Sequence, residues 1–292
     1  MEITPYAPEH RLAVTALAGA TLDLPEDAAE ATAIVNRLLD PPAGRPTVRL
    51  VSGGGTGACF ASLNGATGYV DLVMVDASAR RRGIARGLVT AAERALAELG
   101  ATEVHIAGHA PCYGWPGIDV RYTPAVCLAL ALGYEQYRTG WNMTVDLAAV
   151  RDPAAAEARL AAAGVTVRRA DPVDVPALRE FAGTHFGAGS WPWEVEQCVV
   201  HGACHLAARG DELLGFAGWG ALRPSLFGPM GTAPAAQGMG IGGVLLRRCL
   251  IDQRAAGLTT AQIGWAGPVA FYANAVGARI ERVFVLYRKG VG

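Results

Sequence analysis

The chain has 292 residues, of which 51% are hydrophobic and 17% charged, and its formal net charge is −1. This composition is typical of a soluble globular protein and excludes a disordered chain, and the near-zero charge argues against a nucleic-acid partner. The length suits two domains of about 150 residues each.

The cysteines and the N-terminus indicate the cellular setting. The six cysteines contain no CxxC pair, which argues against a zinc ribbon and against a disulfide framework; they are Cys59, Cys112, Cys127, Cys198, Cys204 and Cys249. The N-terminal stretch MEITPYAPEHRLAV lacks the pattern of a signal peptide, and no apolar run reaches the roughly 18 residues of a membrane span. We therefore expect a cytoplasmic protein with no membrane contact.

The first half, residues 1–147, is predicted to alternate strands and helices around one glycine loop. A strand and a helix are expected in EITPYAPEHRLAVTALAG, and a β-rich segment, GYVDLVMV, leads into the loop RRRGIA at 80–85. A helix (GLVTAAERALAELG), a strand (EVHIAG), a helix ending at a glycine (PAVCLALALGYE) and a final strand follow.

The second half, residues 165–292, repeats this order. It begins with VTVRRADPVDVPALREFAG, and LLGFAGWG and SLFGPMGTA lead into the loop QGMGIG at 237–242. Aligning the two loops brings Gly83 onto Gly240 and Leu88 onto Leu245, as an internal duplication predicts. The alanine-rich residues 148–164 between the halves are predicted to form a linker helix, which would join them semi-rigidly.

The alignment of the halves breaks once. Fifty residues separate Gly83 from Gly133, but thirty-seven separate Gly240 from Gly277. The first half therefore has about thirteen extra residues around HAPCYGWPGIDVRYT, which we expect to shape a cleft or the interface between the halves.

Each glycine loop precedes a predicted helix, where free backbone N–H groups and the helix dipole favour phosphate or pyrophosphate. A Walker A loop requires a lysine followed by Ser or Thr, and neither loop has a lysine, so this kind of phosphate site is excluded. The second loop also spells GxGxxG, but no strand enters its first glycine directly and no acidic residue follows at the expected distance. The remaining alternative is a tight turn whose glycines only relieve crowding.

Both loops fit the pattern of Gln or Arg, two residues, Gly, one residue, and Gly or Ala. The residues are Arg80, Arg81, Arg82, Gly83, Ile84 and Ala85 in the first loop and Gln237, Gly238, Met239, Gly240, Ile241 and Gly242 in the second. With the preceding strand, the following helix and the downstream FYANAVGA, this pattern resembles the acyl-CoA pyrophosphate loop of the GNAT N-acetyltransferase superfamily, in its tandem two-domain bacterial type.

The resemblance implies an α/β (α+β) fold of two tandem GNAT domains, each a mixed, mostly antiparallel sheet flanked by helices. It implies an acyl-CoA cosubstrate, with acetyl-CoA expected and no metal. The backbone amides of the loop would cradle the pyrophosphate, and the strand before it would pair with the pantetheine arm. Arg86, Arg247 and Arg248 are candidate phosphate ligands, with a solvated helix face as the equal alternative.

The resemblance also gives the expected catalytic acid. In the GNAT pattern a tyrosine in the helix after the fifth strand protonates the departing thiolate, and Tyr272 occupies this position, five residues before Gly277. The same count in the first half gives Leu128, which cannot donate a proton. We therefore expect catalysis in the second half; the alternatives are an active site in the first half and a protein that binds acyl-CoA without transfer.

The base and the acceptor are less well defined by the sequence. The strand before the second loop lacks a carboxylate, so Glu194 and Glu196, where the early helices of a GNAT domain line the acceptor cleft, are the candidate bases. Three tryptophans could wall the acceptor site or pack in the core: Trp191, Trp193 and Trp265. We expect a small-molecule amine, amino sugar or amino acid derivative as acceptor, and a monomer or homodimer.

Overall fold

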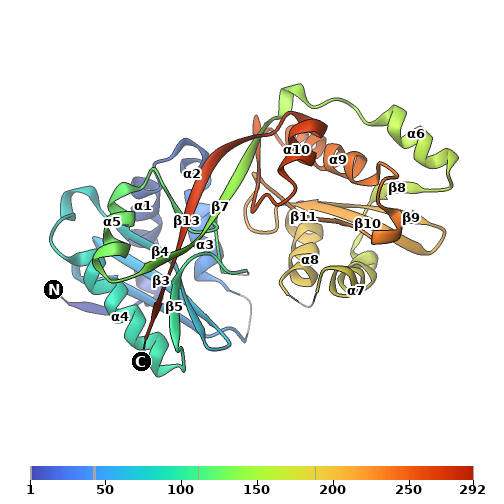
Figure 1. The fold of residues 1–292 in the computed structure, drawn as a ribbon. Coiled ribbons are helices and arrows are strands. Elements are labelled where there is room, and N and C mark those ends of the chain that lie inside the picture. The colour runs from blue at the N-terminus through green and yellow to red at the C-terminus, as the bar shows by residue number, and fades with distance from the viewer. Residues whose placement is uncertain (1, 42–43, 111, 188, 292) are drawn as a thin grey trace. The chain divides into compact units, whose positions relative to one another are not determined.

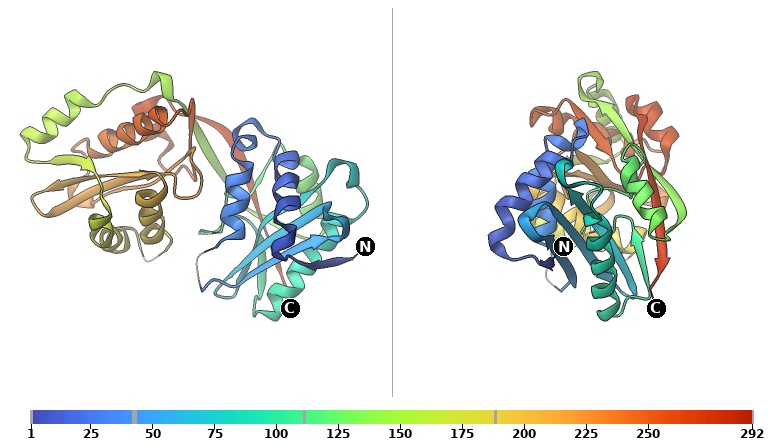
Figure 2. Two further views of the ribbon diagram at one scale, coloured as in Figure 1. Left: turned by 180° about the vertical axis from the view of Figure 1, so that it is seen from behind. Right: turned by 90° about the vertical axis from the view of Figure 1, so that its left-hand side faces the viewer.

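The computed structural model describes residues 2–41, 44–110, 112–187 and 189–291 and divides into two compact units (Figures 1 and 2). Unit 1 comprises the chain up to Gly140 together with the chain from Arg282, and unit 2 comprises Trp141–Glu281. No helix in the described ranges is long and apolar enough to cross a membrane.

Unit 1 is built on one mixed sheet with helices on both faces. The sheet order is β1 (Ile3–Pro5), β2 (Thr47–Ser52), β3 (Gly57–Asn64), β4 (Thr67–Val75), β5 (Glu103–Ile106) and β13 (Arg279–Gly290), and the short β6 (Ile118–Asp119) pairs with β13. Among the strand pairings found in the described residues of unit 1, only that of β4 with β5 is parallel. The helices are α1 (Arg11–Thr21), α2 (Pro25–Ala28), α3 (Ala31–Leu39), α4 (Ile84–Glu98) and α5 (Thr123–Ala131).

Two hydrophobic cores cover the faces of this sheet. Val70 on β4 packs with α4 and α5, whereas Leu72 packs with α1 and α3 on the opposite face. Helices α3 and α4 are amphipathic at a 3.6-residue period, so each buries one stripe of mostly Leu, Val, Ile and Ala against the sheet.

Unit 2 repeats this architecture. Its sheet order is the end of β7 (Glu135–Asp146), β12 (Thr260–Ile263), β11 (Leu226–Thr232), β10 (Glu212–Trp219), β9 (Ala203–Arg209) and β8 (Thr166–Arg169), with only β11 and β12 parallel. Figure 1 shows α7 (Val175–Phe186) and α8 (Trp191–His201) on one face and α9 (Ile241–Ala255) on the other. The remaining helices are α6 (Ala154–Ala162) and α10 (Val269–Val276). Each unit thus has the predicted mixed, mostly antiparallel sheet flanked by helices.

The last strand of each sheet comes from the other half of the sequence. In unit 1, Tyr287–Gly290 of β13 pair antiparallel with β5. In unit 2, Met143–Asp146 of β7 pair antiparallel with β12, the counterpart of β5. The compact units therefore differ from the predicted ranges 1–147 and 165–292, which follow the duplication. The end of β7, from the first half of the sequence, belongs to the sheet of unit 2, and most of β13, from the second half, belongs to the sheet of unit 1. Helix α6 lies inside the predicted linker 148–164 and belongs to unit 2.

Buried ion pairs fix β13 to unit 1. Arg282, which is fully buried, donates to Asp27 at 2.7 and 2.8 Å and to Asp119 at 2.9 Å. Although burial opposes it, hydrogen bonds from Arg121 and Arg282 hold the pKa of Asp119 below its ordinary value. Lys289, near the other end of β13, pairs with the buried Glu93 on α4 at 3.0 Å.

Candidate functional site

The two glycine loops have the same backbone conformation. Gly83 and Gly240 lie in the left-handed region with φ of 80° and 87°, and each is the N-cap residue of the following helix, α4 or α9. Two residues earlier, Arg81 and Gly238 are also left-handed, with φ of 62° and 82°. The duplication inferred from the sequence therefore extends to the local backbone.

Three loop glycines are needed for their backbone conformation and not for lack of space around them. A Cβ atom added at Gly83, Gly238 or Gly240 would meet no heavy atom within 4 Å, apart from its chain neighbours. Relief of crowding is therefore not the reason for these three glycines, although the tight turn of that alternative is present. Their left-handed φ angles, which L side chains rarely adopt, turn the chain into the helix and leave the first N–H groups of the helix without intrahelical acceptors. Such an array of N–H groups suits an anion.

The loops differ in charge. The first loop carries Arg80, Arg81 and Arg82, all of them exposed. The aligned positions in the second loop are Gln237, Gly238 and Met239, which carry no charge. A phosphate group at the second loop would therefore draw on backbone N–H groups and on cations from elsewhere in unit 2.

The arginines of the two loop helices are occupied by structural contacts. Arg86 on α4 donates to the carbonyl oxygen of Ala131 at 3.3 Å, and Arg247 on α9 donates to that of Ala275 at 2.6 Å. Both carbonyls lie two residues before the glycine that ends the next helix, so the same contact recurs in both halves. Arg248 pairs with Glu157 on α6. These contacts give the three arginines a structural role.

In unit 2 the sheet opens beyond one point. Strand β11 pairs with β12 only at Leu226 and Phe227, yet continues to Thr232. From Gly228 to Thr232 this edge of β11 faces no paired strand among the described residues, and we call this stretch the β11 opening. In unit 1, β4 likewise pairs with β5 only up to Tyr69 and continues to Val75, which forms the β4 opening.

A β-bulge begins each opening. In unit 1, Phe60 pairs with Leu72 and Ala61 with Val70, so Asp71 is the extra residue. In unit 2 the pairing of β10 with β11 shifts by one residue between Met230 and Phe227. Asp71 aligns with Gly228, so both bulges lie at the same position of the duplicated strand, and bulges of this kind are frequent beside active sites.

Tyr272 lies beside the β11 opening. Its ring stands edge-on to Phe227, the last paired residue of β11, with 6.2 Å between ring centroids. Burial raises the pKa of Tyr272 to about 12, so its hydroxyl is protonated at neutral pH. Within the described part of the chain, no hydrogen bond to this hydroxyl is found. Leu128, its counterpart in unit 1, packs against the hydrophobic core.

The two candidate bases have different surroundings. Glu194 on α8 is buried, and although a hydrogen bond with Ser190 opposes it, burial raises the pKa of this carboxyl. One helical turn later, the Cys198 thiol contacts the Gly228 carbonyl oxygen at 3.6 Å, so this face of α8 lies against the β11 bulge. Glu196 is partly exposed and forms an ion pair with Arg179 on α7.

Aromatic side chains gather next to the β11 opening. Trp191 lies 4.9 Å from Phe186 and 6.2 Å from Phe216, between ring centroids. Phe186 lies directly over Gly231 of β11, where an added Cβ would fall 2.2 Å from a ring atom. Trp191 thus belongs to an aromatic wall on the side of β11 covered by α7 and α8.

The other two candidate wall residues lie on different elements. Trp193 is partly buried on α8. Trp265 follows β12 in a left-handed conformation, with φ of 49°, and its backbone N–H donates to the side-chain Oδ1 of Asn142 at 3.1 Å.

In unit 1 the extra segment packs against β4. Its Cys112 is buried in one core with Phe60, Leu72 and Met74, and Trp115 packs against this core. Pro111, which belongs to the same segment, lies outside the described residues. Only Gly264–Pro268 lie between β12 and α10 in unit 2, so the insertion covers a face that its counterpart leaves to a short loop.

Asp71 is a residue that the sequence reasoning missed. Burial raises the pKa of this carboxyl well above its ordinary value, and its Oδ1 is buried without a hydrogen-bond partner among the described residues. The available signal was one acidic residue inside the apolar strand GYVDLVMV.

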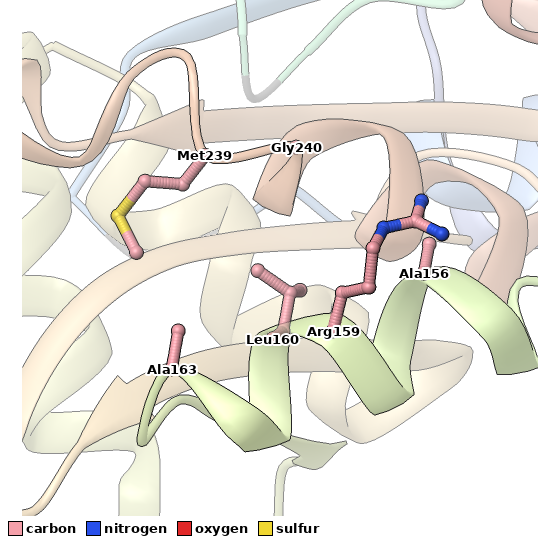
Figure 3. A pocket seen from close by; sticks show the side chains of 6 residues that line it. All are labelled: Ala156, Arg159, Leu160, Ala163, Met239 and Gly240. Carbon is pink, nitrogen blue, oxygen red and sulfur yellow. The ribbon is translucent and has the colours of Figure 1, made fainter.

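A pocket lies beside the second loop, wholly within unit 2. Its volume is about 330 Å³, and Figure 3 shows the six residues that line it, Ala156, Arg159, Leu160 and Ala163 from the region of α6, and Met239 and Gly240 from the loop. No group of three or more His, Cys, Asp or Glu side chains that could hold a metal ion occurs in the described part of the chain.

The chain is similar to known proteins in part of its sequence and in its fold. Residues 34–111, in unit 1, match the model of the acetyltransferase (GNAT) family. No curated protein sequence matches the chain. Among solved structures, a GCN5-related glucosamine N-acetyltransferase region of a fungal multi-domain GH3 β-N-acetylglucosaminidase has a TM-score of 0.77 at 17% identity. This match covers 99% of the present chain, which spans 38% of the fungal one.

Two further structures match over nearly their full length. A tandem GNAT protein from the clavulanic acid biosynthesis pathway has a TM-score of 0.71 at 19% identity, covering 100% of this chain and 98% of that one. A GCN5-related N-acetyltransferase from Sphaerobacter thermophilus has a TM-score of 0.66 at 19% identity, covering 99% and 95%. The predicted two-domain fold is thereby confirmed.

Proposed function

We propose that this chain, which carries a GNAT acetyltransferase domain within a tandem GNAT fold, transfers an acyl group from acyl-CoA, with acetyl-CoA expected, to the amine of a small molecule. The observation that carries the proposal is the position of Tyr272, a buried and protonated donor beside the β11 opening. The backbone N–H groups of the second loop would hold the pyrophosphate, and the free edge of β11 would pair with the pantetheine arm.

Bound acyl-CoA would supply the thioester whose carbonyl carbon the amine attacks. Tyr272 would donate its hydroxyl proton to the sulfur as the C–S bond breaks, because CoA leaves more readily as a neutral thiol than as a thiolate. Glu194 would accept the proton that the amine loses on forming the amide bond, directly or through a water molecule. The raised pKa of Glu194 makes it a stronger base than an ordinary carboxylate, whereas Glu196 is neutralised by Arg179.

Two contrasts between the units favour unit 2 for catalysis. Tyr272 has only Leu128 as its counterpart, and leucine has no proton to give. In addition, Cys112 and Trp115 pack against the face of β4 in unit 1, whereas unit 2 has a short loop at the matching place.

A second candidate is the same reaction in unit 1. It is favoured by Asp71, a buried carboxyl at the β4 bulge, and by the match of residues 34–111 to the family model. Asp71 would then be the base, and water would protonate the thiolate in place of a tyrosine.

For the acceptor we propose an amino sugar or another small amine with an apolar face. Trp191 and Phe186 form an aromatic wall that could stack on the C–H face of a sugar ring. The fungal region of similar fold is described as a glucosamine N-acetyltransferase, which makes glucosamine the first acceptor to test.

The test is CoA thiol release from acetyl-CoA with glucosamine and a panel of small amines. We expect Tyr272→Phe to lower kcat by about 100-fold, the usual scale of general acid catalysis, with little change in KM for acetyl-CoA. The matched control is Tyr287→Phe, which removes a hydroxyl from a buried tyrosine of unit 1. Wild-type turnover in Tyr272→Phe combined with loss of turnover in Asp71→Asn would favour unit 1 instead.

A further inference from the structure

We propose that the pocket between α6 and the second loop holds the 3′-phosphorylated ribose and adenine of CoA, with Arg159 pairing with the 3′-phosphate. The inference rests on the proposed function, because it assigns the far end of the same cosubstrate. Helix α6 and the second loop both belong to unit 2, so the subsite lies within that unit.

The charge difference between the loops is the first argument. Arg82 in the first loop aligns with Met239 in the second, and the preceding two arginines align with uncharged residues. Met239 lines the pocket together with Arg159 of α6 (Figure 3). A cation that the second loop lacks is thus supplied beside it by a different helix.

The partners of the neighbouring arginines are the second argument. Arg247 is bonded to backbone carbonyl groups and Arg248 to Glu157. Arg159 is exposed, and among the described residues its guanidinium has no hydrogen-bond or ion-pair partner. Of the three arginines, Arg159 is therefore the one whose charge is available to a ligand.

The position of Arg159 is fixed by the packing of α6. Leu160, the next residue, is buried, and Glu157, half a turn earlier, pairs with Arg248 of α9. Figure 3 shows Arg159 and Leu160 projecting from α6 on the side that faces the loop. The guanidinium is thus carried by a helix docked to α9, which reduces the entropy cost of binding a phosphate.

The lining of the pocket matches the chemistry of this end of CoA. Leu160, Met239 and two alanines give it apolar walls, and Arg159 adds one cation. An adenine ring offers an apolar face, and the 3′-phosphate is a dianion that a guanidinium binds with two hydrogen bonds. Inorganic phosphate would contact Arg159 but would leave the apolar walls of the pocket without a contact.

The experiment compares the binding of CoA and 3′-dephospho-CoA by calorimetry. It uses the full chain with Gly83→Glu, which blocks the first loop, so that only the second loop is measured. We expect the parent to bind CoA about tenfold more tightly than 3′-dephospho-CoA, the scale of one charge-assisted contact, and Arg159→Gln to reduce this ratio to about one. The matched control is Arg151→Gln, which removes an exposed arginine just before α6 and should keep the ratio.

Three outcomes would overturn the inference. Equal binding of the two ligands by the parent, or a tenfold preference that survives in Arg159→Gln, would refute the role of Arg159 while leaving acyl-CoA binding intact. Binding of neither ligand would instead refute acyl-CoA binding at the second loop, and with it both this subsite and the assignment of catalysis to unit 2. Circular dichroism of each variant checks that the fold is retained.

Discussion

Arg282 and Asp27 lie 255 positions apart in the sequence and form a fully buried pair with two hydrogen bonds, at 2.7 and 2.8 Å. Asp27 belongs to a short helix near the start of the chain, and Arg282 is the first residue of unit 1 after the chain has built unit 2. The pair therefore joins the beginning of unit 1 to the strand that completes it.

We expect Arg282→Met to destabilise the protein by about 3–5 kcal/mol, because it removes the arginine that pairs with the buried carboxylates of Asp27 and Asp119. Urea unfolding followed by tryptophan fluorescence measures the change. Arg279→Met is the control, since its ion pair with Glu281 is largely exposed and should contribute less than about 1 kcal/mol. Equal effects of the two substitutions would contradict the role assigned to the buried pair.

The loops give a prediction that separates the units. Gly240→Glu places a carboxylate where the pyrophosphate is expected and forces a side chain into a left-handed conformation, so we expect acetyl transfer to fall by at least about 100-fold. Gly83→Glu should keep most of the activity. Gly210→Glu, at an exposed left-handed glycine away from both loops, controls for backbone strain. Activity lost in Gly83→Glu and kept in Gly240→Glu would assign catalysis to unit 1.

The raised pKa of Glu194 predicts the acid limb of the pH–rate profile. A base acts only when deprotonated, so kcat/KM should rise with pH through the pKa of Glu194, which burial places above its ordinary value of 4.5. In Glu194→Gln this limb should disappear and the rate should fall by about 100-fold. Glu196→Gln, on the same helix, should keep the limb. A limb unchanged in Glu194→Gln would show that another group is the base.

Asp71 predicts a pH dependence of stability. The folded-state pKa of Asp71 is raised above its unfolded value. Its contribution to the free energy of unfolding is therefore fully present below the unfolded pKa of about 3.9 and is lost as the pH rises through the folded pKa. We therefore expect Asp71→Asn to gain stability relative to wild type as pH rises from 4 to neutrality. Urea titrations at several pH values measure this difference, with the exposed Asp211→Asn as control. A difference that does not change with pH would contradict a raised pKa of Asp71.

The duplication and the loops could be predicted because local spacing encodes them. The helix start at Gly83 and Gly240 needs a left-handed residue, and this need is visible in the sequence as a glycine at a fixed position. The position of Tyr272 followed from its distance to Gly277 in the same way. Its role as the acid remains a prediction.

The exchange of strands could not be predicted, because sheet pairing depends on contacts between distant residues. Nothing in the sequence near Tyr287 distinguishes pairing with β5 from pairing with β12, since the two strands occupy the same place in the two halves. The contacts of Arg247 and Arg248 could not be predicted either, because they too join residues that are distant in the sequence. A helix-face arginine looks alike in sequence whether it meets a phosphate, a carbonyl group or Glu157.

Strand β13 has a consequence for the order of folding during synthesis. The ribosome makes the other elements of unit 1 first, then all of unit 2, and only afterwards Arg282 and Lys289. Until those residues emerge, β5 keeps an unpaired edge and the carboxylate of Asp27 lacks its ion pair with Arg282. The unit that is translated first is therefore the one that closes last, after the nascent chain has already assembled its second copy of the fold.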